Sequence, residues 1–327
     1  MALARLTPAS SLSRWRGSAR VYADAGLHRE TWTPRPRTLE APDGLTPELG
    51  MKSLIAVSLA CVLSQPAGGQ GAGPSKIGET TELTIPSKTY PKGRHAWVYT
   101  PAGYPASCDG ECNLIVAFDG ALYLGAMPLP QILDSLIAAR RTRPAVAVLV
   151  DNGGPPGRIT DLANSHQFAA FVADEILPWV RDHYAVTHTP DRTIIAGSSA
   201  GGLGAAYIAL KYSALFGNVL SQSGAFWRAN EASDSPPYEW LTQQFASSPR
   251  LNVKFFIDVG TRETVGALSG VAPSLLDANR RLRAVLEAKG YSVEYFEVPN
   301  GQHSPDTWRE RLPIGIVGLL PMSPASR

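Results

Sequence analysis

This sequence has few cysteines and histidines, no marked excess of either charge, and no long apolar run. The 327 residues contain no run of about 18 or more apolar residues, the pattern that a membrane-spanning helix requires. With 30 Lys and Arg against 28 Asp and Glu, the net charge is +2, so nothing points to nucleic acid or an anionic membrane as a partner. What remains is the composition of an ordinary soluble globular protein, with 44% apolar residues.

The first 50 residues differ from the rest in their scattered arginine, proline and serine and their lack of apolar periodicity. At Met51 a start methionine, Lys52 and a short apolar core follow one another, and the small residues Ala67-Gly68-Gly69 come soon after. This order is typical of a secretory signal peptide. We therefore interpret residues 1–50 as a disordered leader or a wrongly placed start and 51–69 as a signal peptide, and we expect a periplasmic or secreted protein.

Two other interpretations of the N-terminal part stay open. The arginines among the first 20 residues, with no acidic residue before Asp24, weakly resemble a mitochondrial transit peptide. Leu59-Ala60-Cys61 partly matches a lipoprotein cleavage motif, which makes Cys61 a possible lipid anchor, although Ser58 stands where leucine is expected.

The other two cysteines, Cys108 and Cys112, flank an Asp-Gly pair. In a secreted protein, cysteines this close are typical of a disulfide that clips a surface turn. A metal site would need two further ligands nearby, and the sequence around them offers none. We therefore predict a structural disulfide and no metal site.

Hydrophobic patterning predicts one α/β domain over residues 80–322, after a Gly/Ser/Pro-rich linker at 70–79. Strands are expected at 82–85, 94–100, 113–118, 145–150, a short run from 193, a stretch from 218, 251–259 and 291–298. Helices are expected at 131–141, 167–182, 203–211, 274–289 and 307–320, with a loop at 151–157 and an irregular insertion at 225–250. Alternating strands and helices predict a mostly parallel sheet covered on both faces.

The pattern that organises the chain is Gly197-Ser198-Ser199-Ala200-Gly201, which lies between a β-branched run and an apolar stretch of helical length. Strand, Gly-x-Ser-x-Gly and helix together are the context of a nucleophile elbow, in which a strained turn holds the serine hydroxyl clear of the sheet. Ser199 occupies the central position and Ser198 the variable one. Without that context, the motif would indicate only a tight turn.

A serine nucleophile needs a base, and the base needs a third group to orient it. Of the six histidines, His303 alone follows Ser199, in a Gly/Asn-rich loop after a predicted strand. In α/β hydrolases the order is Ser, acid, His. Asp258 and Glu263, at the end of the predicted strand 251–259, are the candidate acids between Ser199 and His303, and Asp306, which follows His303, is a third choice. We favour Glu263, because Asp258 falls within an apolar strand and Asp306 is placed to cap the final helix.

The oxyanion of the tetrahedral intermediate would be held by backbone N–H groups. We predict the N–H of Ala200 and one from the loop after strand 113–118, at Gly120 or Ala121, where small residues let a substrate oxygen approach the backbone. Arg158 is a candidate for binding an anionic or catecholate-like group, with an internal salt bridge as the alternative. Trp227 is a candidate pocket wall, with core packing as the alternative.

Several segments together resemble the Putative esterase family of the α/β hydrolases, and most closely its enterochelin-esterase group. The segments are 114–120 (LIVAFDG), 148–151 (VLVD), 158–162 (RITDL) with Asn164 and Phe168, 175–180 (EILPWV), 191–203 (DRTIIAGSSAGGL), 216–227 (FGNVLSQSGAFW) and Gly301-Gln302-His303 with Trp308. The resemblance implies an α/β-hydrolase fold, a Ser199–His303–Glu263 triad and no metal or organic cofactor.

The sequence also departs from that group. Asp161 stands where such enzymes usually carry Glu, and the part before about residue 80 has no room for the N-terminal domain of cytoplasmic enterochelin esterases. Some periplasmic relatives work with a Ser–His dyad, which would lessen the role of Glu263. The combined expectation is a serine carboxylic-ester hydrolase that forms an acyl-enzyme on Ser199, acting on a siderophore-type or carbohydrate-linked ester. An acyltransferase of the same fold and a non-catalytic siderophore- or glycan-binding protein are the alternatives.

Overall fold

The structure is a computed structural model that describes residues 77–230 and 235–322. The expected leader, the signal peptide, Cys61 and most of the linker lie outside these residues.

The described residues form an eight-stranded sheet in the order β1-β2-β4-β3-β5-β6-β7-β8. The strands are β1 (Glu79–Ile85), β2 (Arg94–Thr100), β3 (Asn113–Phe118), β4 (Ala145–Val150), β5 (Thr193–Ser198), β6 (Asn218–Gln222), β7 (Lys254–Gly260) and β8 (Ser292–Val298). Strand β2 pairs antiparallel with β1 on one side and with β4 on the other. The other six strands, β3 to β8, are parallel to one another. The predicted mostly parallel α/β sheet is therefore confirmed.

The central strands β3, β4 and β5 are buried at every position, which explains their continuous apolar sequences. Edge strand β1 is exposed at most positions. Because the parallel strands share one direction, their carboxyl ends meet at one edge of the sheet, and the loops that follow them lie there together. This edge carries all the candidate catalytic residues.

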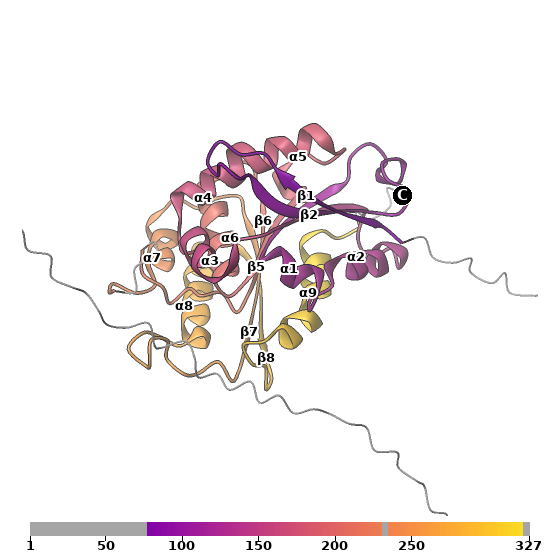
Figure 1. Ribbon diagram of the computed structural model, residues 1–327. Coiled ribbons are helices and arrows are strands. Elements are labelled where there is room, and N and C mark those ends of the chain that lie inside the picture. The colour runs from indigo at the N-terminus through magenta and orange to yellow at the C-terminus, as the bar shows by residue number, and fades with distance from the viewer. Residues whose placement is uncertain (1–76, 231–234, 323–327) are drawn as a thin grey trace, which may run out of the picture. The chain divides into compact units, whose positions relative to one another are not determined.

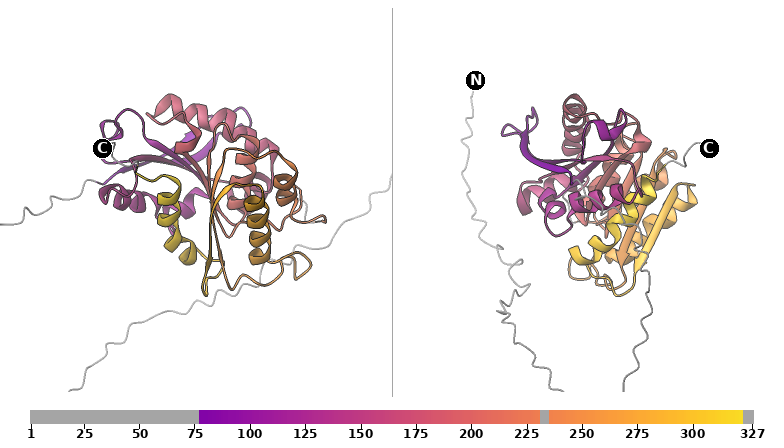
Figure 2. Two further views of the ribbon diagram at one scale, coloured as in Figure 1. Left: turned by 180° about the vertical axis from the view of Figure 1, so that it is seen from behind. Right: turned by 90° about the vertical axis from the view of Figure 1, so that its right-hand side faces the viewer.

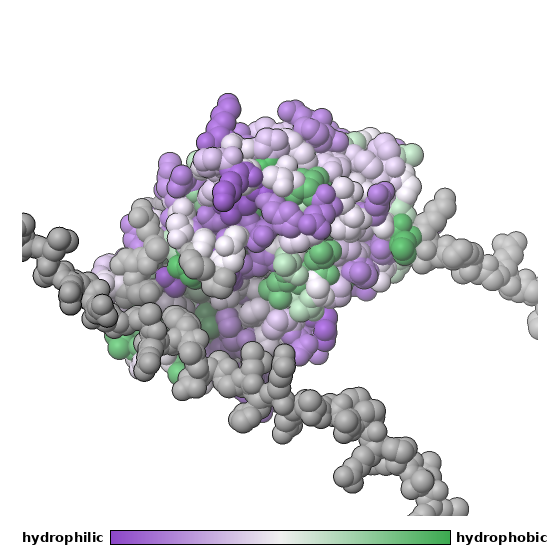
Figure 3. All heavy atoms as spheres, viewed as in Figure 1, coloured by the Kyte–Doolittle hydropathy of each residue, from purple (hydrophilic) through white to green (hydrophobic). Residues whose placement is uncertain are grey.

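Helices cover both faces of the sheet (Figures 1 and 2). On one face the core is built with α1 (Gly120–Leu124), α2 (Leu129–Ala138) and α9 (Pro305–Leu319). On the other it is built with α3 (Gly154–Leu162), α4 (His166–Phe171), α5 (Leu177–His183), α6 (Ala200–Lys211), α7 (Trp240–Ser247) and α8 (Leu275–Ala288). On the face seen in Figure 3, hydrophilic residues predominate and hydrophobic ones gather over the region of α1.

Three helices differ from the sequence-based expectation. The predicted loop 151–157 runs into α3, because proline is tolerated in the first turn of a helix. The short helix α1 follows β3 directly, and α7 lies within the stretch predicted to be irregular. The predicted helix 167–182 is present as α4, a π-helical turn at Val172–Ile176, and α5.

Cys108 and Cys112 are joined by a disulfide, with Cα atoms 4.7 Å apart. Both cysteines are buried, and the backbone of Cys112 forms an isolated parallel β-bridge with that of Val186. Within the described ranges, none of the helices has the length and apolar character needed to cross a bilayer.

Candidate active site

Ser199 lies on a strained turn between β5 and α6. Its backbone has φ 60° and ψ −121°, a region that non-glycine residues rarely adopt and that surrounding bonds must enforce. The Ser199 N–H donates to the carbonyl of Gln222 at 2.9 Å, and the Ser199 carbonyl accepts from the N–H of Ala225 at 2.9 Å. Both backbone groups of the serine are thus fixed by β6 and the loop after it, which is the geometry expected of a nucleophile elbow.

The two glycines of the motif have a steric reason. A Cβ on Gly197 would lie 2.3 Å from the carbonyl carbon of Gly201, so the strand and the helix could not approach as they do. A Cβ on Gly201 would lie 3.3 Å from Oδ2 of Asp119. The motif therefore allows the backbone of β5 to fold directly onto the first turn of α6.

Glu263, in the loop after β7, and His303, in the loop after β8, are in contact. Nδ1 of His303 lies 2.6 Å from Oε2 of Glu263, and the two side chains are 37% and 2% exposed. Because a carboxylate only accepts, Nδ1 carries the proton and Nε2 is left as the acceptor, which is the tautomer that a general base requires. The imidazole packs edge-on against Trp308, with ring centroids 4.9 Å apart.

The second oxygen of Glu263 is held by groups that the sequence did not identify. Oε1 accepts from the N–H of Gly260 at 2.8 Å and from the Ser223 hydroxyl at 2.6 Å. Nε1 of Trp308 donates to that same hydroxyl at 2.8 Å. The carboxylate is thereby buried with both oxygens satisfied, as a buried charge requires.

The other two candidate acids lie elsewhere. Asp258 is wholly buried within β7, accepts from Nε2 of Gln222 at 2.9 Å, and has its pKa raised to about 8 by that burial. Asp306 pairs with Arg309 at 3.0 Å and is 81% exposed. Among the described residues, neither forms a hydrogen bond or ion pair with His303, and of the three acids only Glu263 does so.

The Ser199 hydroxyl makes no hydrogen bond to His303 or to any other described residue, although Ser199 is partly exposed at this edge of the sheet. Catalytic hydrogen bonds of unliganded sites often tighten only when substrate binds. The Ser199–His303 pairing therefore remains a prediction from chain order and from the shared edge.

The predicted oxyanion donors lie on two adjacent turns. Ala200 is the first residue of α6, and Gly120 and Ala121 are the first residues of α1. N–H groups of a first helical turn have no acceptor within the helix, and the preceding strands β5 and β3 are neighbours in the sheet. Both turns therefore lie at this edge, and the binding of one oxyanion by these amides remains a prediction.

Gly120 also has a packing requirement that its local sequence does not reveal. A Cβ there would lie 2.6 Å from the carbonyl oxygen of Leu149. The glycine therefore lets α1 approach the backbone of β4, whether or not a substrate oxygen binds beside it. Ala121, by contrast, is exposed.

The two substrate-binding candidates are engaged within the protein. Arg158 donates from Nε and Nη2 to the two carboxylate oxygens of Asp119, at 2.6 and 2.8 Å. This is the internal salt bridge named above as the alternative, and it argues against a substrate role for Arg158. Trp227 is half-buried against the core, with the guanidinium of Arg228 5.1 Å from its ring centroid.

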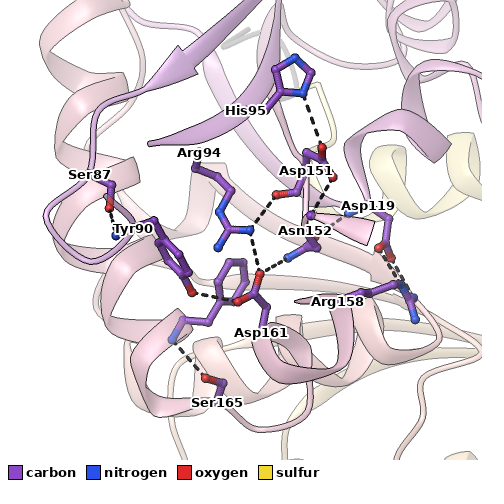
Figure 4. Close-up of polar contacts among 12 residues, drawn as sticks. Ser87, Tyr90, Arg94, His95, Asp119, Asp151, Asn152, Arg158, Asp161 and Ser165 are labelled. Carbon is purple, nitrogen blue, oxygen red and sulfur yellow. Dashed lines mark hydrogen bonds and ion pairs between the residues drawn. The ribbon is translucent and has the colours of Figure 1, made fainter. Parts of the chain in front are cut away.

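A polar network continues from Asp119 through Asn152 to Asp161 (Figure 4). Asp161 pairs with Arg94 at 3.0 Å, accepts from the Tyr90 hydroxyl at 2.9 Å, and accepts from Nδ2 of Asn152 at 3.3 Å. Burial raises the pKa of Asp161, and the Arg94 charge opposes that shift. Asp161, which stands where such enzymes usually carry Glu, thus has partners for both of its carboxylate oxygens.

An open hollow of about 390 Å³ lies beside the imidazole, lined by Arg262, Glu263, Val265, Leu275, Gln302 and His303. In the part of the chain that the structure describes, no group of three or more His, Cys, Asp or Glu side chains is arranged to hold a metal ion.

Comparison with known proteins gives consistent matches. The family model described as Putative esterase matches residues 87–318. The chain is 31% identical over 240 residues to an iron(III) enterobactin esterase of Escherichia coli O6:H1, covering 73% of this chain and 56% of that protein. It is 32% identical over 258 residues to an iron(III) enterobactin esterase of Dickeya dadantii, covering 76% and 56%. The chain thus spans little more than half the length of these relatives.

Among solved structures, the ferric enterobactin esterase of Salmonella typhimurium superposes with a TM-score of 0.64 at 28% identity, covering 74% of this chain and 58% of that one. A ferulic acid esterase superposes with a TM-score of 0.62 at 18% identity, covering 75% and 98%. The second match shares the fold over nearly its whole length.

Proposed function

Since the chain belongs to the Putative esterase family, we propose that it is a serine carboxylic-ester hydrolase with Ser199 as nucleophile, His303 as base and Glu263 as the orienting acid. The observation that carries the proposal is the 2.6 Å contact between His303 and the buried Glu263, at the same edge of the sheet as the strained Ser199 turn. An orienting acid that holds one imidazole tautomer is what serine activation requires.

The proposed reaction proceeds in two halves. The Ser199 oxygen attacks the ester carbonyl while Nε2 of His303 takes the hydroxyl proton, and the amides of Ala200 and of Gly120 or Ala121 bind the oxyanion. As the intermediate collapses, the bond to the alkoxide breaks and His303 returns the proton to it. Water, deprotonated by His303, then attacks the carbonyl of the acyl-enzyme. Collapse of this second intermediate breaks the bond to the Ser199 oxygen, which takes the proton back from His303, and releases the acid.

The substrate class that we propose is a siderophore-type ester, with a carbohydrate-linked ester as the second candidate. The first is supported by the relatives named as enterobactin esterases, and the second only by the shared fold of a ferulic acid esterase. Turnover of a catecholate lactone and of a feruloyl saccharide, compared by product analysis with an acceptor alcohol present, would rank the two and would reveal any acyl transfer.

We also propose that the protein is exported to the periplasm or beyond, through the signal peptide predicted from Met51. The Cys108–Cys112 disulfide supports this, because such bonds persist in oxidising compartments. N-terminal sequencing of the protein from its host would test the proposal. A sequence beginning within residues 1–50 would contradict it.

The decisive experiment is labelling with a fluorophosphonate probe followed by peptide mapping. We expect an adduct on Ser199 that is lost in Ser199→Ala and in His303→Ala. Ser198→Ala is the matched control, because Ser198 is adjacent but wholly buried, with its hydroxyl 3.3 Å from that of Tyr123. A folded wild-type protein that does not react would favour a non-catalytic binding role instead.

A further inference from the structure

The salt bridge between Arg158 and Asp119 joins the two turns that the proposed reaction needs side by side. Asp119 begins the oxyanion loop, residues 119–121, whereas Ser198 begins the nucleophile turn, residues 198–200. Arg158 holds both carboxylate oxygens of Asp119, and its Nη2 also donates to the carbonyl of Ser198 at 3.2 Å. We propose that Arg158 is a positioning residue that fixes the oxyanion loop against the nucleophile turn; this inference rests on the proposed esterase reaction.

The oxyanion loop needs such support because its first residue is strained. Asp119 has φ 60° and ψ 52° in the left-handed region, which a non-glycine residue adopts at a cost. Its N–H donates to Oδ1 of Asn152 at 3.0 Å. Asn152 thus fixes the backbone of Asp119, and Arg158 fixes its side chain.

The nucleophile turn is equally close to Asp119. The Asp119 carboxylate lies against the first turn of α6, where even a Cβ on Gly201 would come within 3.3 Å of Oδ2. One guanidinium therefore contacts Asp119, directly before the amides of Gly120 and Ala121, and Ser198, two residues before the amide of Ala200. Any shift of Arg158 would change the distance between the amide of Ala200 and that of Gly120.

Arg158 is itself held in place by helix α3. Leu162 packs on the backbone of α6 at Gly204, where a Cβ would meet its side chain at 3.1 Å. Asp161, also on α3, is bound by Arg94, Tyr90 and Asn152. Asn152 thus links α3 and the oxyanion loop directly, and the network in Figure 4 makes the helix and the loop one unit.

The test uses Arg158→Lys in the full chain, because lysine keeps the charge but cannot form the two parallel bonds. The measurements are kcat and KM for p-nitrophenyl acetate, the rate of fluorophosphonate labelling, and the melting temperature. Removing one oxyanion donor costs about 100- to 1,000-fold, so we expect a displaced one to lower kcat and the labelling rate by roughly 10- to 100-fold. KM should stay within about threefold, because no substrate contact is removed.

Arg192→Lys is the matched control. Arg192 is also half-buried and also donates from Nε and Nη2, to Oδ1 of Asn113 at 2.9 Å and to the carbonyl of Glu111 at 2.6 Å. Arg192 lies directly before β5, at the amino ends of the parallel strands and away from the proposed site. Its variant should therefore lose comparable stability and keep kcat and the labelling rate within about twofold.

The outcomes are distinct. A wild-type protein that neither labels nor turns over would overturn the proposed function and this inference with it. A labelled wild type with an unchanged labelling rate in Arg158→Lys would overturn the inference alone, as would a raised KM at constant kcat, which indicates substrate binding. Should Arg158→Lys fail to fold, Asp119→Asn keeps the side-chain shape and weakens the same pair. Its labelling rate should fall likewise, and an unchanged rate would contradict the inference.

Discussion

Ser223 donates a 2.6 Å hydrogen bond to Oε1 of Glu263, the carboxylate oxygen that does not face His303. The Ser223 hydroxyl in turn accepts from Nε1 of Trp308, whose ring also packs against the imidazole. Ser223 is wholly buried and has a left-handed backbone with φ 46°. A single residue after β6 therefore connects the proposed acid with the aromatic ring that supports the proposed base.

Replacing Ser223 with alanine should lower both activity and stability. Glu263 would keep the N–H of Gly260 but lose its hydroxyl donor, and one hydrogen bond of about 1.4 kcal/mol corresponds to a roughly tenfold fall in kcat/KM. Nε1 of Trp308 would be left buried without an acceptor, at a cost of about 1–3 kcal/mol. Steady-state kinetics on p-nitrophenyl acetate and urea unfolding would measure the two effects.

Ser221→Ala is the control for that variant. Ser221 lies two residues earlier, is wholly buried, and its hydroxyl has no hydrogen-bond partner among the described residues. The same substitution should therefore leave kcat/KM unchanged and stability unchanged or higher. Equal losses in Ser221→Ala and Ser223→Ala would show that burial alone, and not the contact with Glu263, accounts for the effect.

Glu263→Gln tests the acid against its rivals. The amide would present an N–H to Nδ1 of His303 and favour the tautomer whose Nε2 cannot take the serine proton, so kcat should fall by about 10²- to 10⁴-fold. Asp306→Asn should have wild-type kinetics, because Asp306 is exposed and pairs with Arg309. A Glu263→Gln variant within about tenfold of wild type would instead support a Ser–His dyad.

Chain order and local pattern were enough to predict much of this fold. The strands at 113–118 and 145–150 match β3 and β4 at both ends, because strands buried on both faces read as uninterrupted apolar runs. The strand–serine–helix succession predicted the turn at Ser199, and position after the serine singled out His303. The structure then placed Glu263, the favoured acid, against that histidine.

What the sequence could not predict depends on contacts between distant segments. Ser223 and Glu263 are 40 residues apart, and Asp119 and Arg158 are 39 apart. No local pattern reveals that their side chains meet, because the meeting follows from strand order in the sheet. Helix α3 was missed for a different reason, since its Gly/Pro-rich start has the composition of a loop.

Gly120→Ala should displace the oxyanion loop. The new Cβ would lie 2.6 Å from the carbonyl oxygen of Leu149 and 3.0 Å from the Trp97 ring, so α1 must move away from β4. We expect a loss of about 1–3 kcal/mol in the free energy of unfolding, as for other overpacked sites, together with lower kcat at similar KM. Gly125→Ala, whose nearest atom would be the Ala121 oxygen at 3.3 Å, should change both much less. Retained kcat in a destabilised Gly120→Ala would argue against an oxyanion role for this loop.

Asp258 should make stability depend on pH in a direction opposite to that of a paired surface carboxylate. Burial raises its pKa to about 8, and the hydrogen bond from Gln222 only partly opposes this. An unfolded Asp titrates near pH 3.9, so between about pH 4 and 8 the folded protein holds a proton that the unfolded chain has lost. Rising pH therefore destabilises the fold through this residue, by at most about 1.4 kcal/mol per pH unit.

Asp258→Asn isolates that contribution, because asparagine does not titrate and can still accept from Nε2 of Gln222. The difference in free energy of unfolding, variant minus wild type, should grow from pH 5 to pH 8 and become constant above, since both states are then ionised. Urea unfolding at each pH gives this difference, and other titrating groups cancel in it. The variant should keep wild-type kcat at pH 7, because Asp258 does not contact His303. A difference that stays constant across the whole range would mean that Asp258 is already ionised in the folded protein at pH 5.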